Sequence, residues 1–183
     1  MNHWQLRFTL KSLKSGGVIA YPTESVYGLG CDAINLTAIE HLLLIKNRSY
    51  KKGLIILVSE IQQAFPLLSP LSSAQINQIK QGSPRATTWL IEKDPGVSQL
   101  LSGEYQKLAV RITTNPVARR LCKMLGRPIV STSCNLNTKP TSTQVSRIRN
   151  QMLIKVDKVI AGRCCGQRPS QIIDLESGTI IRQ

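Results

Sequence analysis

The segment between residues 18 and 30 constrains the fold more than any other part of the chain. An apolar, strand-like run from Val18 to Tyr21 stops at Pro22, and a short polar segment (23–25) and a glycine-rich turn (28–30) follow it. Small polar residues and glycines at the end of a strand are where α/β folds place ligands, because the backbone can approach a ligand there without clashes from Cβ atoms. The segment therefore predicts an α/β protein with a ligand site beside this strand.

Strand and helix patterns alternate along the rest of the chain. Apolar runs predict further strands at residues 54–58, 87–91, 108–112, 128–131, 156–161, 171–175 and 179–182, the last two joined in a hairpin by Ser177-Gly178. Helices are expected at residues 4–13, 37–46, 72–80, 116–125 and 143–153. The second helix would begin at a capping box, Thr37-x-x-Glu40, and the fourth at Asn115-Pro116. We expect one α/β domain over residues 1–183, with a mixed sheet of about seven strands whose order the pattern leaves open.

The composition excludes several classes of protein. Hydrophobic residues make up 42% of the chain, but no apolar run approaches the roughly 20 residues of a membrane helix. The first residues lack the apolar block of a signal peptide, so a cytoplasmic protein with no membrane contact is expected. Five cysteines include no Cys-x-x-Cys pair, and two histidines accompany them, so reduced thiols are expected rather than a zinc site.

The net charge of +14 is unevenly distributed. Residues 1–105 hold ten basic and seven acidic residues, whereas residues 106–183 hold 14 basic and three acidic residues. Such a field attracts polyanions, so nucleic acid is the expected large partner, and an ATP-like substrate would also be favoured. A charge that serves solubility alone stays an open alternative.

Two segments could hold an anionic ligand. Lys46 and Arg48 end a predicted helix, where two cations can simply complement the helix dipole, but Lys51 and Lys52 follow at once, and four cations before a buried strand are more typical of a phosphate clamp. The second segment, Ser131-Thr132-Ser133-Cys134-Asn135, follows a strand. Its side chains could form local turns or could bind a carboxylate, an amino group or a phosphate.

Three single residues each have more than one possible role. Cys134 could be a nucleophile, but no histidine lies near it in sequence, and a small packed residue is favoured. Glu24 could bind a metal, bind an amine or cap a turn, and His41 is more typical of a packed or surface histidine than of a catalytic one. The chain contains neither Gly-x-x-x-x-Gly-Lys-Ser/Thr nor Gly-x-Gly-x-x-Gly, so it is not a P-loop protein or a standard dinucleotide binder.

Taken together, these segments resemble the YrdC/TsaC family of threonylcarbamoyl-AMP synthases, in its short bacterial single-domain form. The resemblance spans nearly the whole chain, and its order and spacing are carried by residues 20–32 (AYPTESVYGLGCD), 46–55 (KNR…KGLI), 108–113 (LAVRIT), 128–136 (PIVSTSCNL), 169–174 (PSQIID) and 180–182 (IIR). It implies a twisted α/β sheet with a large, positively charged concave face. It also implies that L-threonine, bicarbonate and ATP give threonylcarbamoyl-adenylate and pyrophosphate. Partner transferase proteins would then move the threonylcarbamoyl group to an adenosine beside the tRNA anticodon.

The resemblance also assigns site residues. The catalytic set would be Lys46, Arg48, Ser133 and Asn135. The residues that bind L-threonine would be Thr23, Ser25, Tyr27, Arg111 and Asn135. The nucleotide would be held by Lys46, Arg48, Lys52, Ser133, Ser170 and Arg182. Mg²⁺ is expected to arrive with ATP, with its ligands unassigned, and tRNA or double-stranded RNA is a further expected partner on the basic face.

Four departures from the family pattern bear on the site. Ser25 stands where many members have Thr, Lys52 where many have Asn, and Cys134 where many have Ala. Residues 82–87 replace the family's Pro-Gly-Pro-x-Thr stretch, which puts that wall of the site in question.

Two other functions remain as alternatives. A basic RNA-binding module of the same fold, such as a ribosome maturation factor, would need the basic face but not an intact Lys46-x-Arg48 and Ser133-x-Asn135. A carbamoyl-phosphate-using relative, as in hydrogenase maturation, would carry zinc-finger and acylphosphatase-like segments that are absent here. Both considerations favour the synthase.

Overall fold

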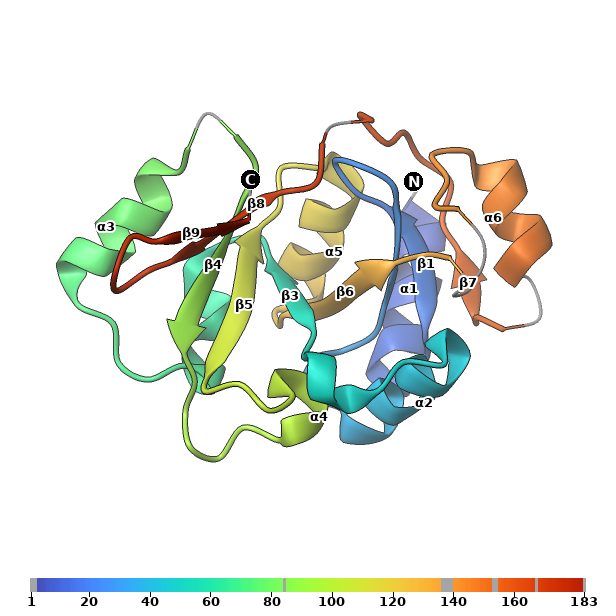
Figure 1. Ribbon diagram of the computed structural model, residues 1–183. Helices are drawn as coiled ribbons and strands as arrows, with labels where there is room; N and C mark the ends of the chain where they lie inside the picture. Colours follow the sequence, from blue (N-terminus) through green and yellow to red (C-terminus); the bar gives the residue numbers. More distant parts are fainter. Residues whose placement is uncertain (1–2, 84, 136–139, 153–154, 167, 183) are drawn as a thin grey trace.

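The computed structural model describes residues 3–83, 85–135, 140–152, 155–166 and 168–182. Nine strands of the described chain form one sheet, in the order β7-β1-β2-β6-β3-β5-β4-β8-β9, which crosses the molecule from β7 to β9 (Figure 1). The strands are β1 (Ile19–Pro22), β2 (Tyr27–Gly30), β3 (Ile55–Val58), β4 (Thr87–Glu92), β5 (Lys107–Ile112), β6 (Ile129–Ser133), β7 (Lys158–Val159), β8 (Gln171–Asp174) and β9 (Ile180–Arg182).

The sheet is mixed, as the sequence predicts. Parallel pairs join β1 to β7, β3 to β5 and β4 to β8, and the other neighbours are antiparallel. The hairpin predicted at Ser177-Gly178 is confirmed, with Gly178 at a φ of +70° and its N–H donating to the Asp174 carbonyl at 2.9 Å. The α/β fold class is therefore confirmed, with two more strands than the seven expected.

The interpretation of residues 28–30 as a turn is wrong, because these residues form β2. The chain reverses earlier, where the Thr23 hydroxyl donates to the Val26 carbonyl at 2.7 Å. A Cβ on Gly30 would lie 2.2 Å from the Val130 carbonyl oxygen of the next strand, and one on Gly28 would lie 3.0 Å from a Thr23 methyl. The glycines thus allow close strand packing rather than a turn.

Six α-helices and two 3-10 helices are formed by the described residues. The α-helices are α1 (His3–Lys14), α2 (Leu36–Lys46), α3 (Ser73–Gln81), α4 (Gln99–Ser102), α5 (Pro116–Leu125) and α6 (Val145–Met152), and the 3-10 helices are η1 (Tyr50–Lys52) and η2 (Ile61–Leu67). All five predicted helices are present, whereas α4, η1 and η2 were not foreseen. The predicted ends at Leu153 of the last helix and at residues 1 and 183 of the domain lie outside the described residues.

Helix capping matches the sequence at α5 but not at α2. The Asn115 side chain accepts from the N–H groups of Val117 and Ala118, as predicted. At α2 the N-cap is Asn35, whose side chain accepts from the Ala38 N–H at 3.0 Å. The Thr37-x-x-Glu40 capping box is therefore wrong: Asn35 already serves the N–H groups of the first turn, and Thr37 lies inside the helix.

Helices cover both faces of the sheet. Helices α1 and α5 bury apolar side chains against Ile19, Tyr21 and Leu57 on one face. Helices α2 and α6 pack with Ala20, Tyr27 and Ile56 on the other face. Alternate residues of the strands thus enter two cores, which fixes the register of the central strands. In the part of the chain that the structure describes, no helix has the length and apolarity to cross a bilayer.

Candidate active site

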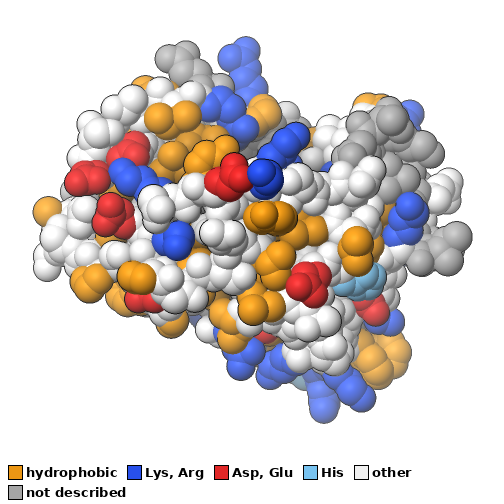
Figure 2. Space-filling model, turned by 60° about the horizontal axis from the view of Figure 1, so that its bottom comes forward, with side chains coloured by type: hydrophobic (Ala, Val, Ile, Leu, Met, Phe, Trp, Pro, Cys, Tyr) orange, Lys and Arg blue, Asp and Glu red, His pale blue; other side chains and the backbone are white. Residues whose placement is uncertain are grey.

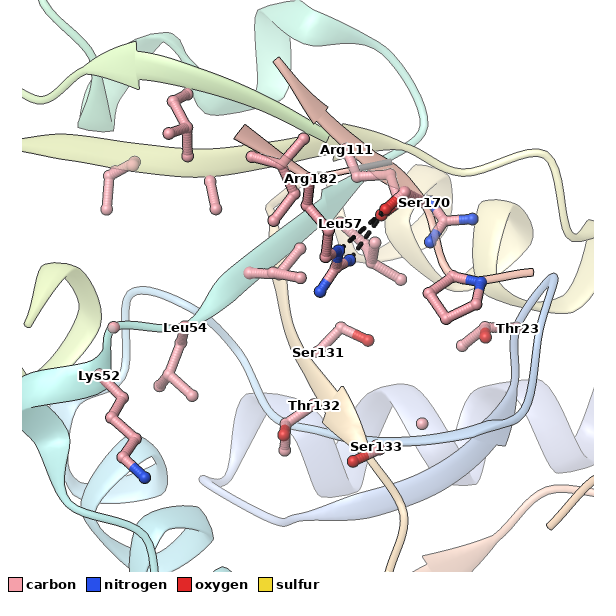
Figure 3. Close-up of a pocket in the computed structure, with 18 of the residues that line it drawn as sticks. Thr23, Lys52, Leu54, Leu57, Arg111, Ser131, Thr132, Ser133, Ser170 and Arg182 are labelled. Carbon is pink, nitrogen blue, oxygen red and sulfur yellow. Dashed lines mark hydrogen bonds between the residues drawn. The ribbon is translucent and has the colours of Figure 1, made fainter. Parts of the chain in front are cut away.

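A cavity of about 1000 Å³ opens over the central strands (Figure 3). Its floor includes Leu57, Leu90, Ala109 and Ile172, from four different strands. Five cationic side chains and one carboxylate are among the described residues that line it: Arg48, Lys52, Lys107, Arg111, Arg182 and Glu24. This lining accords with the basic concave face that the family resemblance implies, and it suits an anionic ligand with an apolar part.

The end of β6 brings three predicted site residues together. The Lys46 ammonium donates to the Ser133 carbonyl at 2.8 Å, to the Asn135 carbonyl, and to the Asn135 side-chain oxygen at 3.0 Å. The Ser133 hydroxyl donates to that same side-chain oxygen at 2.7 Å. Burial lowers the pKa of Lys46, which is 4% exposed. Ser133 lines the cavity, and Lys46 fixes the loop behind it.

Arg48 follows α2 by way of Asn47, which adopts a left-handed φ of 45°. The Arg48 guanidinium donates to the Gly53 carbonyl at 2.9 Å, and its buried Nε has no hydrogen-bond partner among the described residues. Burial lowers the pKa of this guanidinium. Lys52 is exposed and lines the cavity as well. Of the four cations in the predicted phosphate clamp, Arg48 and Lys52 line the cavity, whereas Lys46 is bonded to the loop after β6 and Lys51 pairs with Glu104 at 2.9 Å.

Glu24 lies at the centre of a buried network. Its Oε1 accepts from the Thr113 hydroxyl at 2.8 Å and from the Thr114 N–H at 2.7 Å. Its Oε2 lies 2.9 Å from Arg111 Nη2, as an ion pair rather than an aligned hydrogen bond. Burial alone would raise the pKa of Glu24, but Arg111 and these hydrogen bonds together lower it. Of the three uses left open for Glu24, the capping of a turn fits best, because the carboxylate accepts from the N–H groups of Thr114 and Asn115 at the start of α5.

The predicted threonine-binding residues differ in accessibility. Thr23, Ser25, Tyr27 and Arg111 all line the cavity. The Thr23 hydroxyl is used by Val26, and the Tyr27 hydroxyl lies 3.1 Å from the carbonyls of Ile160 and Gly162. These two side chains shape the wall, whereas Ser25 and Arg111 are better placed to meet a ligand.

The nucleotide residues predicted near the C-terminus contact each other. Arg182 donates from Nη2 to the Ser170 carbonyl at 2.8 Å, and its guanidinium points into the cavity (Figure 3). The Ser170 hydroxyl is buried and lies 2.8 Å from the Thr88 hydroxyl. Ser170 thus orients Arg182 through its backbone.

Some cavity residues were missed by the sequence analysis. Lys107, Tyr105 and Gln106 line the cavity, and Lys107 is held by Asp174 at 2.7 Å and Glu176 at 3.2 Å. No local motif marks them, since they lie just before or at the start of an ordinary strand, β5. Residues 82–87, whose sequence departs from the family, contribute none of the described lining residues, and Pro84 lies outside the described residues.

The environment of Cys134 bears on whether it could act as a nucleophile. Burial raises the pKa of Cys134 to about 12, which favours a packed residue over a nucleophile. His41 is exposed. No group of three or more His, Cys, Asp or Glu side chains that could hold a metal ion occurs within the described ranges.

A mixed sheet with a cationic, hydroxyl-lined cavity is an arrangement suited to a protein that binds a small anionic ligand. The family model described as "telomere recombination" (Sua5/YciO/YrdC) matches residues 11–183. The chain belongs to this family, which confirms the family recognised from its motifs.

Three relatives illustrate the similarity. A threonylcarbamoyl-AMP synthase of Methylococcus capsulatus is 40% identical over 181 residues, which cover 98% of this chain and 97% of that protein. The crystal structure of P. abyssi Sua5 complexed with L-threonine has a TM-score of 0.86 and 26% identity, over 95% of this chain and 52% of that one. E. coli YciO has a TM-score of 0.84 and 25% identity, over 100% of this chain and 90% of that one.

Proposed function

We propose that this protein is a threonylcarbamoyl-AMP synthase that forms threonylcarbamoyl-adenylate and pyrophosphate from L-threonine, bicarbonate and ATP. The observation that carries the proposal is the single cavity in which Arg48, Lys52 and Arg182 are combined with Arg111 and the Ser133 hydroxyl. The names of the curated relatives support the same activity and favour it over an RNA-binding module without turnover.

The charges of the reactants explain why such a cavity is needed. The amine of threonine and bicarbonate give a carbamate and water, and a carbamate oxygen then attacks the α-phosphorus of ATP as pyrophosphate leaves. Both partners of this attack are anions. Arg48, Lys52 and Arg182 would offset their repulsion and stabilise the charge that develops on the phosphoryl oxygens.

The remaining residues would position the reactants. Arg111 offers a planar set of donors that fits the carboxylate of threonine. Ser133 would contact the ligands, while Lys46 and Asn135 hold the end of β6 in place. Most of the rate acceleration would then come from orientation rather than from covalent catalysis.

Mg²⁺ finds no site of its own in this lining. Glu24 is the single carboxylate among the described lining residues, and it is already used by Arg111, Thr113 and Thr114. Mg²⁺ prefers oxygen ligands and commonly binds substrate phosphates. The expected Mg²⁺ would therefore be held by the phosphates of ATP, and no step is assigned to a protein-bound ion.

The wider setting is part of the proposal. Cytoplasmic transferase proteins would consume the adenylate, and RNA could contact surfaces outside the cavity. Helices α1 and α5, which contact each other, carry Lys and Arg and no Asp or Glu. Figure 2 shows Lys and Arg side chains gathered along the lower edge of its view. Cationic helices without acidic residues suit a polyanion.

Pyrophosphate release by the purified protein tests the proposed activity. ATP, L-threonine, bicarbonate and Mg²⁺ are supplied together, and each is omitted in turn. Release that requires ATP, threonine and bicarbonate supports the synthase. No release, together with salt-dependent binding of an RNA duplex, would support the binding module instead.

A further inference from the structure

The Glu24 carboxylate, beside the cavity, interacts with four other residues. It is 2% exposed and lies in the loop between β1 and β2. Its two oxygens reach Arg111 on β5, the Thr113 hydroxyl, and the N–H groups of Thr114 and Asn115 at the start of α5. One carboxylate therefore joins the loop after β1 to the segment that runs from the end of β5 to the start of α5, about 90 residues later in the sequence.

Asn115 extends the same network to the cavity rim. Its side-chain amide donates to the carbonyl of Thr23 at 3.1 Å and to that of Arg163 at 3.2 Å. The Cys165 N–H donates to the Glu24 carbonyl at 3.1 Å. These hydrogen bonds fix the rim on this side of the cavity to the α5 N-terminus. The backbone around Arg111 is therefore held in place.

Arg111 is the group on which this network acts. It is 8% exposed, and its accessible part lines the cavity. Because Nη2 faces Glu24, the guanidinium is oriented, and within the described ranges no residue accepts a hydrogen bond from its other donors, which could serve a ligand. A long side chain that is already oriented loses little conformational entropy when a ligand binds.

The network also divides the cavity by charge. At the end that holds Arg111 and Thr23, the arginine is neutralised by Glu24; Lys52 lies at the opposite end (Figure 3). Among the described lining residues, Lys52 and Arg48, which donates to the Lys52 and Gly53 carbonyls, have no carboxylate partner. A triphosphate is drawn to the end with net positive charge, whereas a single carboxylate can still dock on the Arg111 fork.

We propose that Glu24 is a positioning and specificity-determining residue that orients Arg111 for the carboxylate of the amino-acid substrate and keeps the triphosphate out of that end. The inference rests on the proposed synthase function. It assigns Glu24 no direct contact with the reacting atoms.

The test is the variant Glu24→Gln, which keeps the shape and removes the charge. We expect the KM for L-threonine to rise at least tenfold, while the KM for ATP changes less than threefold. We also expect ATP at high concentration to inhibit the variant, with excess threonine relieving the inhibition, because the phosphates can now enter the Arg111 end. An unchanged KM for threonine, or an equal rise for both substrates, would overturn the proposal.

Asp32→Asn is the matched control. Asp32 is also 2% exposed and pairs with an arginine, Arg127 at 3.1 Å, but neither residue lines the cavity. Its loss should lower stability and leave both KM values within threefold. If Asp32→Asn raised the threonine KM as Glu24→Gln does, general loosening would explain the effect and the proposal would be wrong.

Two further results separate the possible failures. If Glu24→Gln does not fold, Glu24→Asp retains the charge but withdraws it from Arg111, and the same threonine-selective rise in KM is expected; its absence refutes the inference. If the wild-type protein releases no threonine-dependent pyrophosphate, the proposed function itself fails, whatever the variants do.

Discussion

Replacement of Gly30 by alanine tests how closely β2 must approach β6. A Cβ at this position would lie 2.2 Å from the Val130 carbonyl oxygen and 2.8 Å from a ring carbon of Tyr21. Favourable contacts between such atoms begin near 3.5 Å, so the two strands must separate by about 1 Å. Val130 is also fixed from behind, because its strand is paired with β3 through Ile56.

The loss in free energy of unfolding caused by Gly30→Ala can be estimated from known effects of overpacking. Extra methyl groups in a packed core cost about 1–3 kcal/mol, and a clash with backbone belongs at the upper end. For a domain of this size, about 3 kcal/mol lowers Tm by roughly 6–12 °C. Because β6 carries Ser133 into the cavity, a shift of about 1 Å should also reduce pyrophosphate release by about 100-fold.

Urea unfolding and the Tm of Gly30→Ala measure the effect, with Gly28→Ala as the control in the same strand. The nearest atoms to a Cβ at Gly28 are side-chain atoms, at 3.0 Å on Thr23 and 3.2 Å on Ser131, so about 1 kcal/mol is expected there. If Gly30→Ala were as stable as the wild type, or less affected than Gly28→Ala, the argument for close strand packing would be refuted.

Four further predictions follow from the site and the fold. Arg48→Ala should reduce pyrophosphate release at least 100-fold, yet change the free energy of unfolding by only about 1 kcal/mol, because the hydrogen bonds lost are one to the Gly53 carbonyl and a longer one to the Lys52 carbonyl; near-normal turnover would contradict the site assignment. In the native protein a thiol reagent at pH 8 should label Cys165 within minutes and the four buried cysteines only after unfolding, as mass spectrometry would show; rapid labelling of a second cysteine would count against the fold. Because the pKa of Glu24 is lowered in the folded protein, its contribution to stability is complete above the unfolded-state pKa of about 4.3 and is lost as the pH falls through the lower folded-state value. The free energy of unfolding, measured with urea, should therefore fall more steeply below pH 4 in the wild type than in Glu24→Gln. Equal slopes for the two proteins would argue against the ion pair. Asn35→Ala should lower the free energy of unfolding by about 1 kcal/mol and Thr37→Ala by less than half as much, since Asn35 is the N-cap; the reverse order would restore the capping box that the sequence suggested.

Patterns local to the chain determined much of the architecture. The continuous apolar run that ends at Val58 is too short for a helix, so it predicts a buried strand. Asn115-Pro116, followed by good helix formers, predicts the start of a helix from local sequence alone. The motifs that contain Lys46, Arg48, Ser133 and Asn135 identified the family, because their order and spacing are independent of any contact.

Only the tertiary structure decided how these residues are used. Residues 28–30 resemble a turn when the sequence is considered alone. In the fold, the glycine at position 30 instead permits the close approach of Val130, a hundred residues later. Lys46 looks like a cavity cation, yet its ammonium is bonded to the loop at Ser133, which is 87 residues away. The role of Glu24 likewise depends on Arg111, Thr113 and Thr114, which lie on or just after β5, four strands away from β1 in the sheet order. Sequence patterns report which conformation a segment prefers, whereas the partner of a buried charge is set by contacts between distant segments, and those exist only once the sheet is assembled.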